Sequence, residues 1–538
     1  MTDFHKKSIQ SLLSEKRLAE AFAELRQTAQ TLQNWQLNNR LDELEESYKY
    51  MIRYVADGCN DPQREEIHNG ITAKLMELAD ITEQELTVQN SPKLYYETLR
   101  MERKYPRSLE ALLESYRECA DKTALFYELP ADKRDSDQER TLLMEKEKAA
   151  NAVFKHIWVT FPVTANEAGT LDKLFADADA TAEIKELAMA ATMLSLLEHY
   201  SEHLLLSLLD LYAANAFNDA SLSMKALCCA LIAMHCHRET IKHSSAISLR
   251  IANIADSERG RRDIMTVFLQ FIRSRSTERI SQKVRDELVP KLMKLSPEMR
   301  RKMRDGFSDD IEEMAKNPDW QEMLNESGIT DKMQELSRMQ AEGSDVFLSS
   351  FARLKSFPFF NDVANWFVPF TPRHSSIFRV FAGNSGSMLL SMVDRTGAFC
   401  DSDKFSFALS VATMPDQHRS MMMAQFDEQQ EQVINEMAGS LPNPDKQREN
   451  IANKYVQSLY RFFNLFRSRN DFYNPFSTRL NLIDVPFVSD ALSDTKSLRL
   501  IAEFYFSMQC YTDALSTFGK VLKQDSPTAS DYQKTGYC

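Results

Sequence analysis

The stretch "RLIAEFYFSMQCYTDALSTFGKVL", residues 499–522, carries two groups of apolar residues at helical spacing. Each group combines a small residue with a large one. The six residues are Ile501, Ala502, Tyr505, Tyr511, Ala514 and Phe518. The two alanines let antiparallel helices approach closely, and the aromatic side chains fill the groove that this leaves. The stretch therefore predicts a tightly packed helix hairpin.

These residue types in this order resemble a tetratricopeptide repeat over residues 497–527. The resemblance implies a helical repeat that recognises protein partners through its surface. Three positions depart from the family: Gln509 stands where a turn glycine is usual, Val521 replaces an alanine, and Pro527 comes one residue late.

The chain also resembles the start of a further repeat at its end. A shift by the family's roughly 34 residues carries Leu498 onto Tyr532 and Ala502 onto Gly536. Because no capping helix follows, we expect an N-terminal portion of a longer repeat protein. We also expect the last ten residues to be poorly ordered or held by a neighbouring molecule.

The composition predicts an all-α protein. Only 13 glycines and 17 prolines occur in 538 residues. Leu, Ala, Glu, Lys, Gln and Met fill the space between them, and these residues lose little on entering a helix. The length exceeds the roughly 100 to 200 residues of a single domain, so we expect several domains or an extended array.

The middle of the chain repeats with a period of 37 residues. Three apolar triplets recur at this spacing, each on one face of a predicted helix, with further helices between them. They are Ala190, Leu194 and Leu197; Leu227, Leu231 and Met234; and Ile264, Phe268 and Phe271. This stack of helix pairs resembles a HEAT or armadillo array, which implies units that bury their apolar faces on one another.

The expected fold is thus an α-solenoid of helical hairpin repeats with a small irregular, aromatic-rich insert. Gly383, Gly386 and Gly397 mark the stretch where any short strand would lie. The predicted segments are an N-terminal helical hairpin region (1–180), HEAT-like repeats (181–300), an acidic helical linker (301–345), an aromatic and loop-rich segment (346–400), a helical region (401–494) and the tetratricopeptide repeat with the start of a second one (495–538).

Charge and composition also limit the class of partner. A net charge of −13 opposes binding to a phosphate backbone, so we expect no nucleic acid partner. The longest apolar run, Leu187 to Leu197, is about half the roughly 20 residues of a membrane helix, and the N-terminus lacks a signal-peptide core. Eight cysteines without metal-type spacing favour reduced thiols in the cytoplasm.

Two groups of residues could bind a metal. "HYSEH" contains His199, Glu202 and His203 in the H-x-x-E-H pattern of certain zinc hydrolases, although it lies where one helix is expected to end and another to begin. A second group lies in and after "CCALIAMHCH": Cys228, Cys229, His235, Cys236, His237 and His243. Cys228 and His235 are two turns apart along a helix, as are Cys229 and Cys236, which favours buried core residues over ligands of one ion.

Charged and aromatic segments offer further candidates. Residues 259–304 hold 14 basic and 5 acidic residues, and residues 305–345 hold 12 acidic and 3 basic, so we expect them to neutralise each other. An aromatic cluster follows, which is either an internal plug between helical blocks, the favoured interpretation, or an interface. Its members are Phe357, Phe359, Phe360, Trp366, Phe367 and Phe370.

The favoured function is a protein–protein interaction scaffold without catalysis or cofactor, which binds a protein or peptide partner. The alternative is a zinc-dependent hydrolase that uses His199, Glu202 and His203. "GNSGS" at 383–387 lacks the spacing of a phosphate-binding loop.

Overall fold

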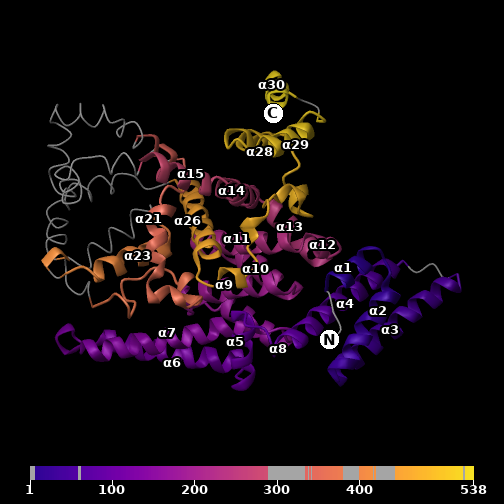
Figure 1. Ribbon diagram of the computed structural model, residues 1–538, viewed down its shortest axis with the longest axis horizontal. Coiled ribbons are helices and arrows are strands. Elements are labelled where there is room, and N and C mark those ends of the chain that lie inside the picture. Colours follow the sequence, from indigo (N-terminus) through magenta and orange to yellow (C-terminus); the bar gives the residue numbers. More distant parts are fainter. Residues whose placement is uncertain are drawn as a thin grey trace.

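The computed structural model describes residues 6–58, 62–288, 334–379 apart from 337 and 341, 399–419 apart from 416, 443–524 and 527–538. All regular elements within these ranges are helices, which confirms the all-α class for the part of the chain described (Figure 1). The glycine-rich stretch at 383–397, most of the acidic segment and the end of the basic segment lie outside these ranges. Within them, no helix has the length and apolar character needed to cross a membrane.

The N-terminal region is a bundle of four helices with a core of its own (Figure 1). The helices are α1 (Lys6–Ser14), α2 (Leu18–Leu32), α3 (Trp35–Ala56) and α4 (Arg64–Thr87). Leu25, Leu41 and Leu75 are completely buried in this core. Helix α5 (Leu94–Lys104) and a long hairpin connect the bundle to the middle region. The hairpin consists of α6 (Leu109–Glu128), the turn η1 (Ala131–Lys133) and α7 (Ser136–Val159). The turn between α6 and α7 is short, and Asp135 caps the start of α7.

The middle region consists of helices that contact their neighbours in two rows. The elements are α8 (Ala165–Ala176), α9 (Ala182–Glu198), α10 (Glu202–Asn215), α11 (Ala220–Cys236), α12 (Arg238–Ile241), α13 (Ser245–Asp256), α14 (Glu258–Ser274), α15 (Thr277–Lys283) and the π-helical turn η2 (Val284–Leu288). Helices α9, α11 and α14 form one row, and α8, α10 and α13 form the other. The three predicted triplets lie on α9, α11 and α14, where eight of their nine residues are buried and Leu197 is half-buried.

Polar N-cap residues begin several of these helices at the turns of the chain. Ser201, Asp219 and Ser244 each accept a hydrogen bond from a backbone N–H in the first turn of the helix that follows. Gly260 permits the tightest turn, because a Cβ at this position would lie 1.9 Å from the carbonyl oxygen of Ile254. Helices α13 and α14 can therefore follow each other with only Ser257 between them.

The segments after residue 345 return to the middle region. They are α21 (Leu348–Ala352), η3 (Arg353–Ser356), η4 (Pro358–Asn361), η5 (Ala364–Trp366), α23 (Asp401–Ala412), α26 (Pro444–Leu465), η6 (Arg469–Asp471), η7 (Pro475–Ser477), η8 (Leu482–Asp484) and α27 (Val488–Ala491). Helix α26 contacts both α11 and α14. As a result α11 is buried without interruption from Leu222 to His235, as expected of a helix with neighbours on all sides.

The chain ends in three helices that project from the body: α28 (Thr495–Ser507), α29 (Tyr511–Val521) and α30 (Ala529–Tyr537) (Figure 1). Helix α30 begins with a capping box between Thr528 and Asp531 and packs against α29. The structure thus contradicts the expectation that the last ten residues are poorly ordered or need a neighbouring molecule. The sequence prediction missed this capping box and the ion pair that Asp531 makes with Arg499 at 3.0 Å.

Candidate functional site

The C-terminal hairpin has the packing that its residue pattern predicts. Ile501, Ala502, Tyr505, Ala514 and Phe518 are all completely buried between α28 and α29. The sixth residue, Tyr511, is half-buried, and its ring lies 5.6 Å from that of Phe506 and 5.7 Å from that of Tyr537. These six residues therefore hold the hairpin together, and the surface available to a partner consists of other side chains.

Gln509 occupies the turn between the two helices with a φ of +61°. This left-handed conformation favours glycine, which is the residue that the tetratricopeptide pattern has there. The Cys510 N–H donates to the Tyr505 carbonyl (2.9 Å), and the Gln509 side chain accepts a hydrogen bond from Arg279 (2.5 Å). The chain thus makes the turn despite its departure from the pattern.

The hairpin joins the body through a partly buried ion pair. Arg275, which follows α14, contacts Asp513 of α29 at 2.7 Å, and its guanidinium lies 5.5 Å from the centre of the Tyr505 ring. Burial alone lowers the pKa of Arg275, but its hydrogen bond and charge interaction with Asp513 outweigh this and raise it. The Tyr505 hydroxyl donates to Asn481 Oδ1 (3.1 Å), which fixes the hairpin to the loop before α27.

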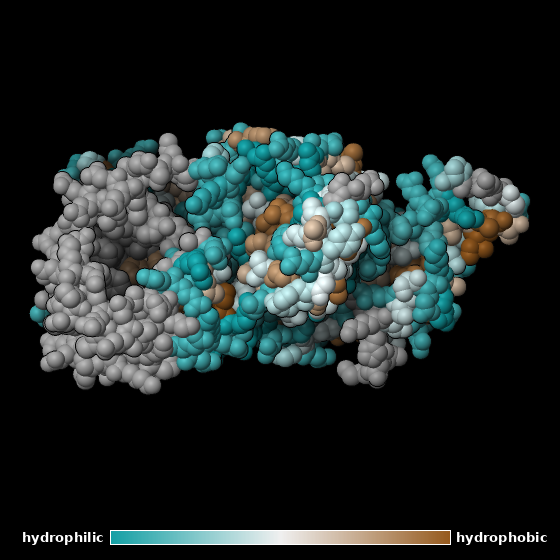
Figure 2. All heavy atoms as spheres, turned by 90° about the horizontal axis from the view of Figure 1, so that it is seen from above, coloured by the Kyte–Doolittle hydropathy of each residue, from teal (hydrophilic) through white to brown (hydrophobic). Residues whose placement is uncertain are grey.

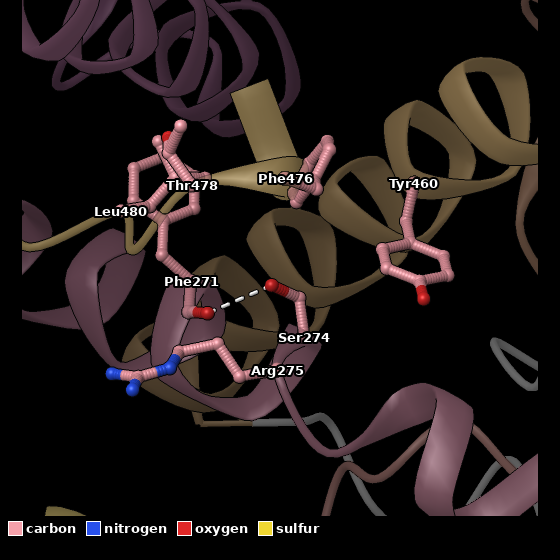
Figure 3. A pocket seen from close by; sticks show the side chains of 7 residues that line it. All are labelled: Phe271, Ser274, Arg275, Tyr460, Phe476, Thr478 and Leu480. Carbon is pink, nitrogen blue, oxygen red and sulfur yellow. Dashed lines mark hydrogen bonds between the residues drawn. The ribbon is translucent and has the colours of Figure 1, made fainter. Parts of the chain in front are cut away.

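A cavity of about 80 Å³ lies beside this joint (Figure 3). Its lining comes from the end of α14, from α26 and from the loop around η7: Phe271, Ser274, Arg275, Tyr460, Phe476, Thr478 and Leu480. Small-molecule sites usually occupy about 300 to 1,000 Å³, and one water needs roughly 10 to 15 Å³. This cavity therefore has the size for a few waters and is too small for a typical metabolite.

The residues of the zinc-hydrolase hypothesis do not converge. His199 follows α9 outside any helix, is 5% exposed, and packs its ring 4.4 Å from that of Phe161 with Nδ1 3.5 Å from Asp80. His203 lies on the surface of α10, 3.7 Å from Asp172, and Glu202 accepts a hydrogen bond from Ser244. The three residues thus do not share one helical face. Within the described ranges no group of three or more His, Cys, Asp or Glu side chains is placed to hold a metal.

Half of the cysteine- and histidine-rich group lies in the core. Cys228, Cys229 and His235 are buried, and Cys229 Sγ lies 3.2 Å from the Tyr455 hydroxyl of α26. Burial raises the pKa of both Cys228 and Cys229, which keeps them as thiols. His237 contacts the Leu196 carbonyl at 2.5 Å, Cys236 is half-buried, and His243 is exposed. Cys228, Cys229 and His235 are therefore core residues of α11, whereas Cys236, His237 and His243 lie nearer the surface.

The aromatic cluster packs inside the molecule. Phe360, Trp366 and Phe367 are buried, while Phe357, Phe359 and Phe370 are half-buried. The rings contact α7, α23 and α26 through Phe154, Phe405 and Phe462, respectively. Trp366 Nε1 donates to the Phe360 carbonyl (2.9 Å). This burial favours the internal plug over the interface, because the largest rings of the cluster cannot reach a partner.

The sequence prediction missed a buried ion cluster behind these rings. Arg461 of α26 contacts Asp345 at 2.7 Å and Asp403 at 2.8 Å, and Asp403 also contacts Lys355 at 3.0 Å. The cluster contains two positive and two negative charges, so each buried charge has an opposite partner. It joins α26, α23 and the segment around α21.

A second buried pair links Arg448 of α26 to Asp263 of α14 at 2.6 Å, and Tyr212 of α10 donates to the same carboxylate at 2.8 Å. The sequence pattern of α26 indicates that Arg448 lies on the buried face of this helix. Arg448 stands in line with Ala452, Val456 and Leu459 at helical spacing, and a charge within an apolar stripe indicates a buried partner.

The described residues of the basic segment pair with several different parts of the chain. Lys283 contacts Glu335 of the acidic segment at 2.6 Å. Arg273 contacts Glu449 of α26 at 2.8 Å, and Arg262 contacts Asp445 at 3.1 Å. Mutual neutralisation of the two segments therefore accounts for one described pair, while α26, the hairpin and Glu258 of α14 provide partners for others.

Comparison with known proteins adds no relative: no known protein family, curated protein or solved structure matches this chain.

Proposed function

We propose that the chain is a protein–protein interaction scaffold built from helical repeats and that it performs no catalysis. In this proposal, α8 to α14 form a short solenoid and α28 to α30 form a tetratricopeptide-like end. The two rows of contacting helices and the packing of α28 against α29, where Ala502 and Ala514 are completely buried, support it. The seven cysteines in the described ranges are free thiols, which suits a protein of the cytoplasm.

The observation that carries the proposal is the surface of the C-terminal helices. Four large apolar side chains are exposed there: Leu500 (48%), Leu515 (42%), Tyr532 (58%) and Tyr537 (69%). Helices α28 to α30 project from the body, so a partner can reach them (Figure 1). Aromatic and aliphatic side chains on a rigid helical support are typical anchors for a peptide or a partner helix.

The face of α11 and α14 that would otherwise be open is less suited to this role. Helix α26 already covers it with Arg448, Asn453 and Tyr455, which contact Asp263, Gln270 and Cys229. We therefore place the partner site on the C-terminal helices.

The test uses the full chain as bait in a lysate of its native cell, followed by titration of the purified partner. The double variant Leu515→Glu/Tyr532→Glu should weaken binding at least tenfold, because it places two charges in an apolar contact. Leu125→Glu, also exposed and helical (66%), is the matched control and should bind normally. If the double variant and the control bound the partner equally well, the partner site would not lie on the C-terminal helices.

A separate measurement tests the absence of catalysis. Metal analysis of the purified chain should find no stoichiometric zinc. Zinc that disappears in the double variant His199→Ala/His203→Ala would overturn the scaffold proposal in favour of the hydrolase.

A further inference from the structure

Residues 362–379 form a strap that runs along the α6–α7 hairpin, antiparallel to α7. Asp362, at the start of the strap, pairs with Lys155 near the end of α7 at 3.2 Å. Arg379, at the end of the strap, pairs with Asp137 in the first turn of α7. The strap thus follows α7 over roughly 27 Å, at about 1.5 Å per residue.

The middle of the strap is held by one carboxylate of α7. Glu147 accepts hydrogen bonds from both the N–H (2.7 Å) and the hydroxyl (2.5 Å) of Ser375. Directly after Ser375 the strap turns inward, because Ile377 and Phe378 are buried and their N–H groups donate to the His374 carbonyl (3.0 and 2.9 Å). The contact between Glu147 and Ser375 therefore lies where the strap enters the core.

No lysine or arginine pairs with Glu147 among the described residues, although its side chain is only 22% exposed. Lys146, next to it, pairs with Glu183 of α9 instead (2.5 Å), and Arg373 of the strap lies over a tyrosine ring of α6. Helices α5 and α6, which also pack on α7, make no ion pair or hydrogen bond with Glu147 in the described ranges. His374 Nδ1 lies 3.6 Å away, but burial lowers the pKa of this histidine to about 4, so it is neutral near pH 7.

A buried carboxylate without a paired cation holds its proton more tightly than one in water. Burial raises the pKa of Glu147 from its ordinary 4.5 to about 7; the charge of Glu183 adds to this, whereas the hydrogen bonds from Ser375 and the charge of Lys146 oppose it. The protonated carboxyl also fits the contact, because it can donate to the Ser375 hydroxyl and still accept from the Ser375 N–H.

The proton therefore favours the closed strap. When the strap opens, Glu147 is hydrated and its pKa returns toward the ordinary value. Closing takes up a proton between pH 4.5 and about 7, so the closed strap is favoured at low pH and loses this advantage as the pH rises through 7.

We propose that residues 362–379 act as a pH-dependent latch, which Glu147 holds closed in its protonated form and loosens in its ionised form. Hydrophilic side chains cover most of the described surface in the view of Figure 2. Opening of the strap would add the buried Ile377 and Phe378 to the exposed surface, so pH would control how much apolar area the molecule presents. This inference does not depend on the proposed function, because it concerns α7 and the strap rather than the C-terminal helices.

Hydrogen exchange of the full chain at pH 6 and pH 8, corrected for the intrinsic pH dependence of exchange, tests the latch. Protection of the Ile377 and Phe378 amides should be about tenfold higher at pH 6, because a closed-state pKa of about 7 changes the opening equilibrium by that factor. Glu147→Gln cannot ionise and should show nearly equal protection at both pH values. Glu145→Gln, exposed and two positions away on α7, is the matched control and should keep the native difference.

Ser375→Ala provides a second test, because it keeps the N–H donor and loses the hydroxyl. Protection of the strap should fall at both pH values, with the higher value remaining at pH 6. Native circular dichroism spectra and melting temperatures would show that the variants are folded. Equal protection of the native chain at both pH values, a pH difference that persists in Glu147→Gln, or unchanged protection in Ser375→Ala would each overturn the proposal.

Discussion

At the scale of single residues, Gln509 is a position where the C-terminal hairpin differs from the tetratricopeptide pattern, which has glycine in this turn. Gln509 is held at a φ of +61°, where a side chain costs about 1 kcal/mol relative to glycine. Its hydrogen bond from Arg279 is exposed and offsets little of this cost.

We therefore expect Gln509→Gly to stabilise the hairpin. Relief of the left-handed strain outweighs the greater freedom of glycine in the unfolded chain, and the net gain should be about 0.5 kcal/mol. Urea unfolding of the full chain, followed by hydrogen exchange of α28 and α29, measures it. Lys523→Gly, at an exposed position without positive φ, is the control, and a stability loss in Gln509→Gly as large as in this control would contradict the argument.

Trp366 tests the role of the aromatic cluster. Its side chain is 2% exposed, so Trp366→Ala should reduce the free energy of unfolding by about 3 to 5 kcal/mol. Trp35, which is 68% exposed, provides the matched control, and Trp35→Ala should cost less than about 1 kcal/mol. Equal stability of both variants in thermal unfolding would argue against the internal plug.

At the scale of elements, two of the ion pairs that join α14 to α26 differ mainly in burial. Arg448 and Asp263 are each about 5% exposed, whereas Arg262 and Asp445 are 56% and 51% exposed. Removing one partner of a buried pair leaves a charge without compensation in the core, while an exposed charge remains hydrated.

Arg448→Met should consequently destabilise the chain by about 3 to 5 kcal/mol, and Arg262→Met by less than about 1 kcal/mol. Denaturant unfolding of both variants at the same ionic strength gives the comparison. Similar losses of unfolding free energy in the two variants would show that burial does not determine how much each ion pair contributes to stability.

A histidine of α7 connects this helix to α5 and α8. His156 lies 3.4 Å from Glu102 and 3.0 Å from Glu167. Burial by itself lowers the pKa of His156, but the hydrogen bonds with Glu102 and Glu167 outweigh it and raise the pKa to about 9.

Because the folded pKa lies above the unfolded value of about 6.5, the charged histidine stabilises the fold fully below pH 6.5, and this contribution is lost as the pH rises to 9. His156→Gln should therefore cost on the order of 2 kcal/mol more at pH 6 than at pH 9.5. Unfolding of native chain and variant at several pH values measures the difference. A difference that does not depend on pH would contradict the charged state of His156.

Elements that form through contacts between residues close in sequence could be predicted, whereas those that depend on contacts between distant residues could not. The all-α class, the hairpin residues such as Ala502 and the triplets on α9, α11 and α14 were accessible because each rests on local spacing. The position of α26 was not, since Arg448 meets Asp263 across 185 residues of sequence. His199 kept a motif spacing, yet the helix ended before it, which a short pattern does not reveal.

At the scale of the whole molecule, the described residues contain two separate hydrophobic cores. One lies among α1 to α4, and the other extends from Val88 to the C-terminal hairpin. Regions with separate cores can open independently, with a local free energy below the global one.

Leu75→Ala should therefore raise hydrogen exchange in α1 to α4 while protection of α9 to α14 remains. Leu75 is fully buried, so the local cost is about 2 to 5 kcal/mol. Leu208→Ala in α10, equally buried, should have the reverse effect. Loss of protection across the whole chain in both variants would mean that the two cores unfold together.

The late position of α26 also affects the nascent chain. Asp263 leaves the ribosome 185 residues before Arg448, a delay of roughly 10 to 40 s at usual rates of synthesis. During that interval, Cys229 and Gln270 lack Tyr455 and Asn453, the α26 residues that later contact them. We therefore expect a nascent chain that still lacks α26 to expose side chains of α11 and α14 that are buried in the folded chain, and this exposure favours chaperone binding.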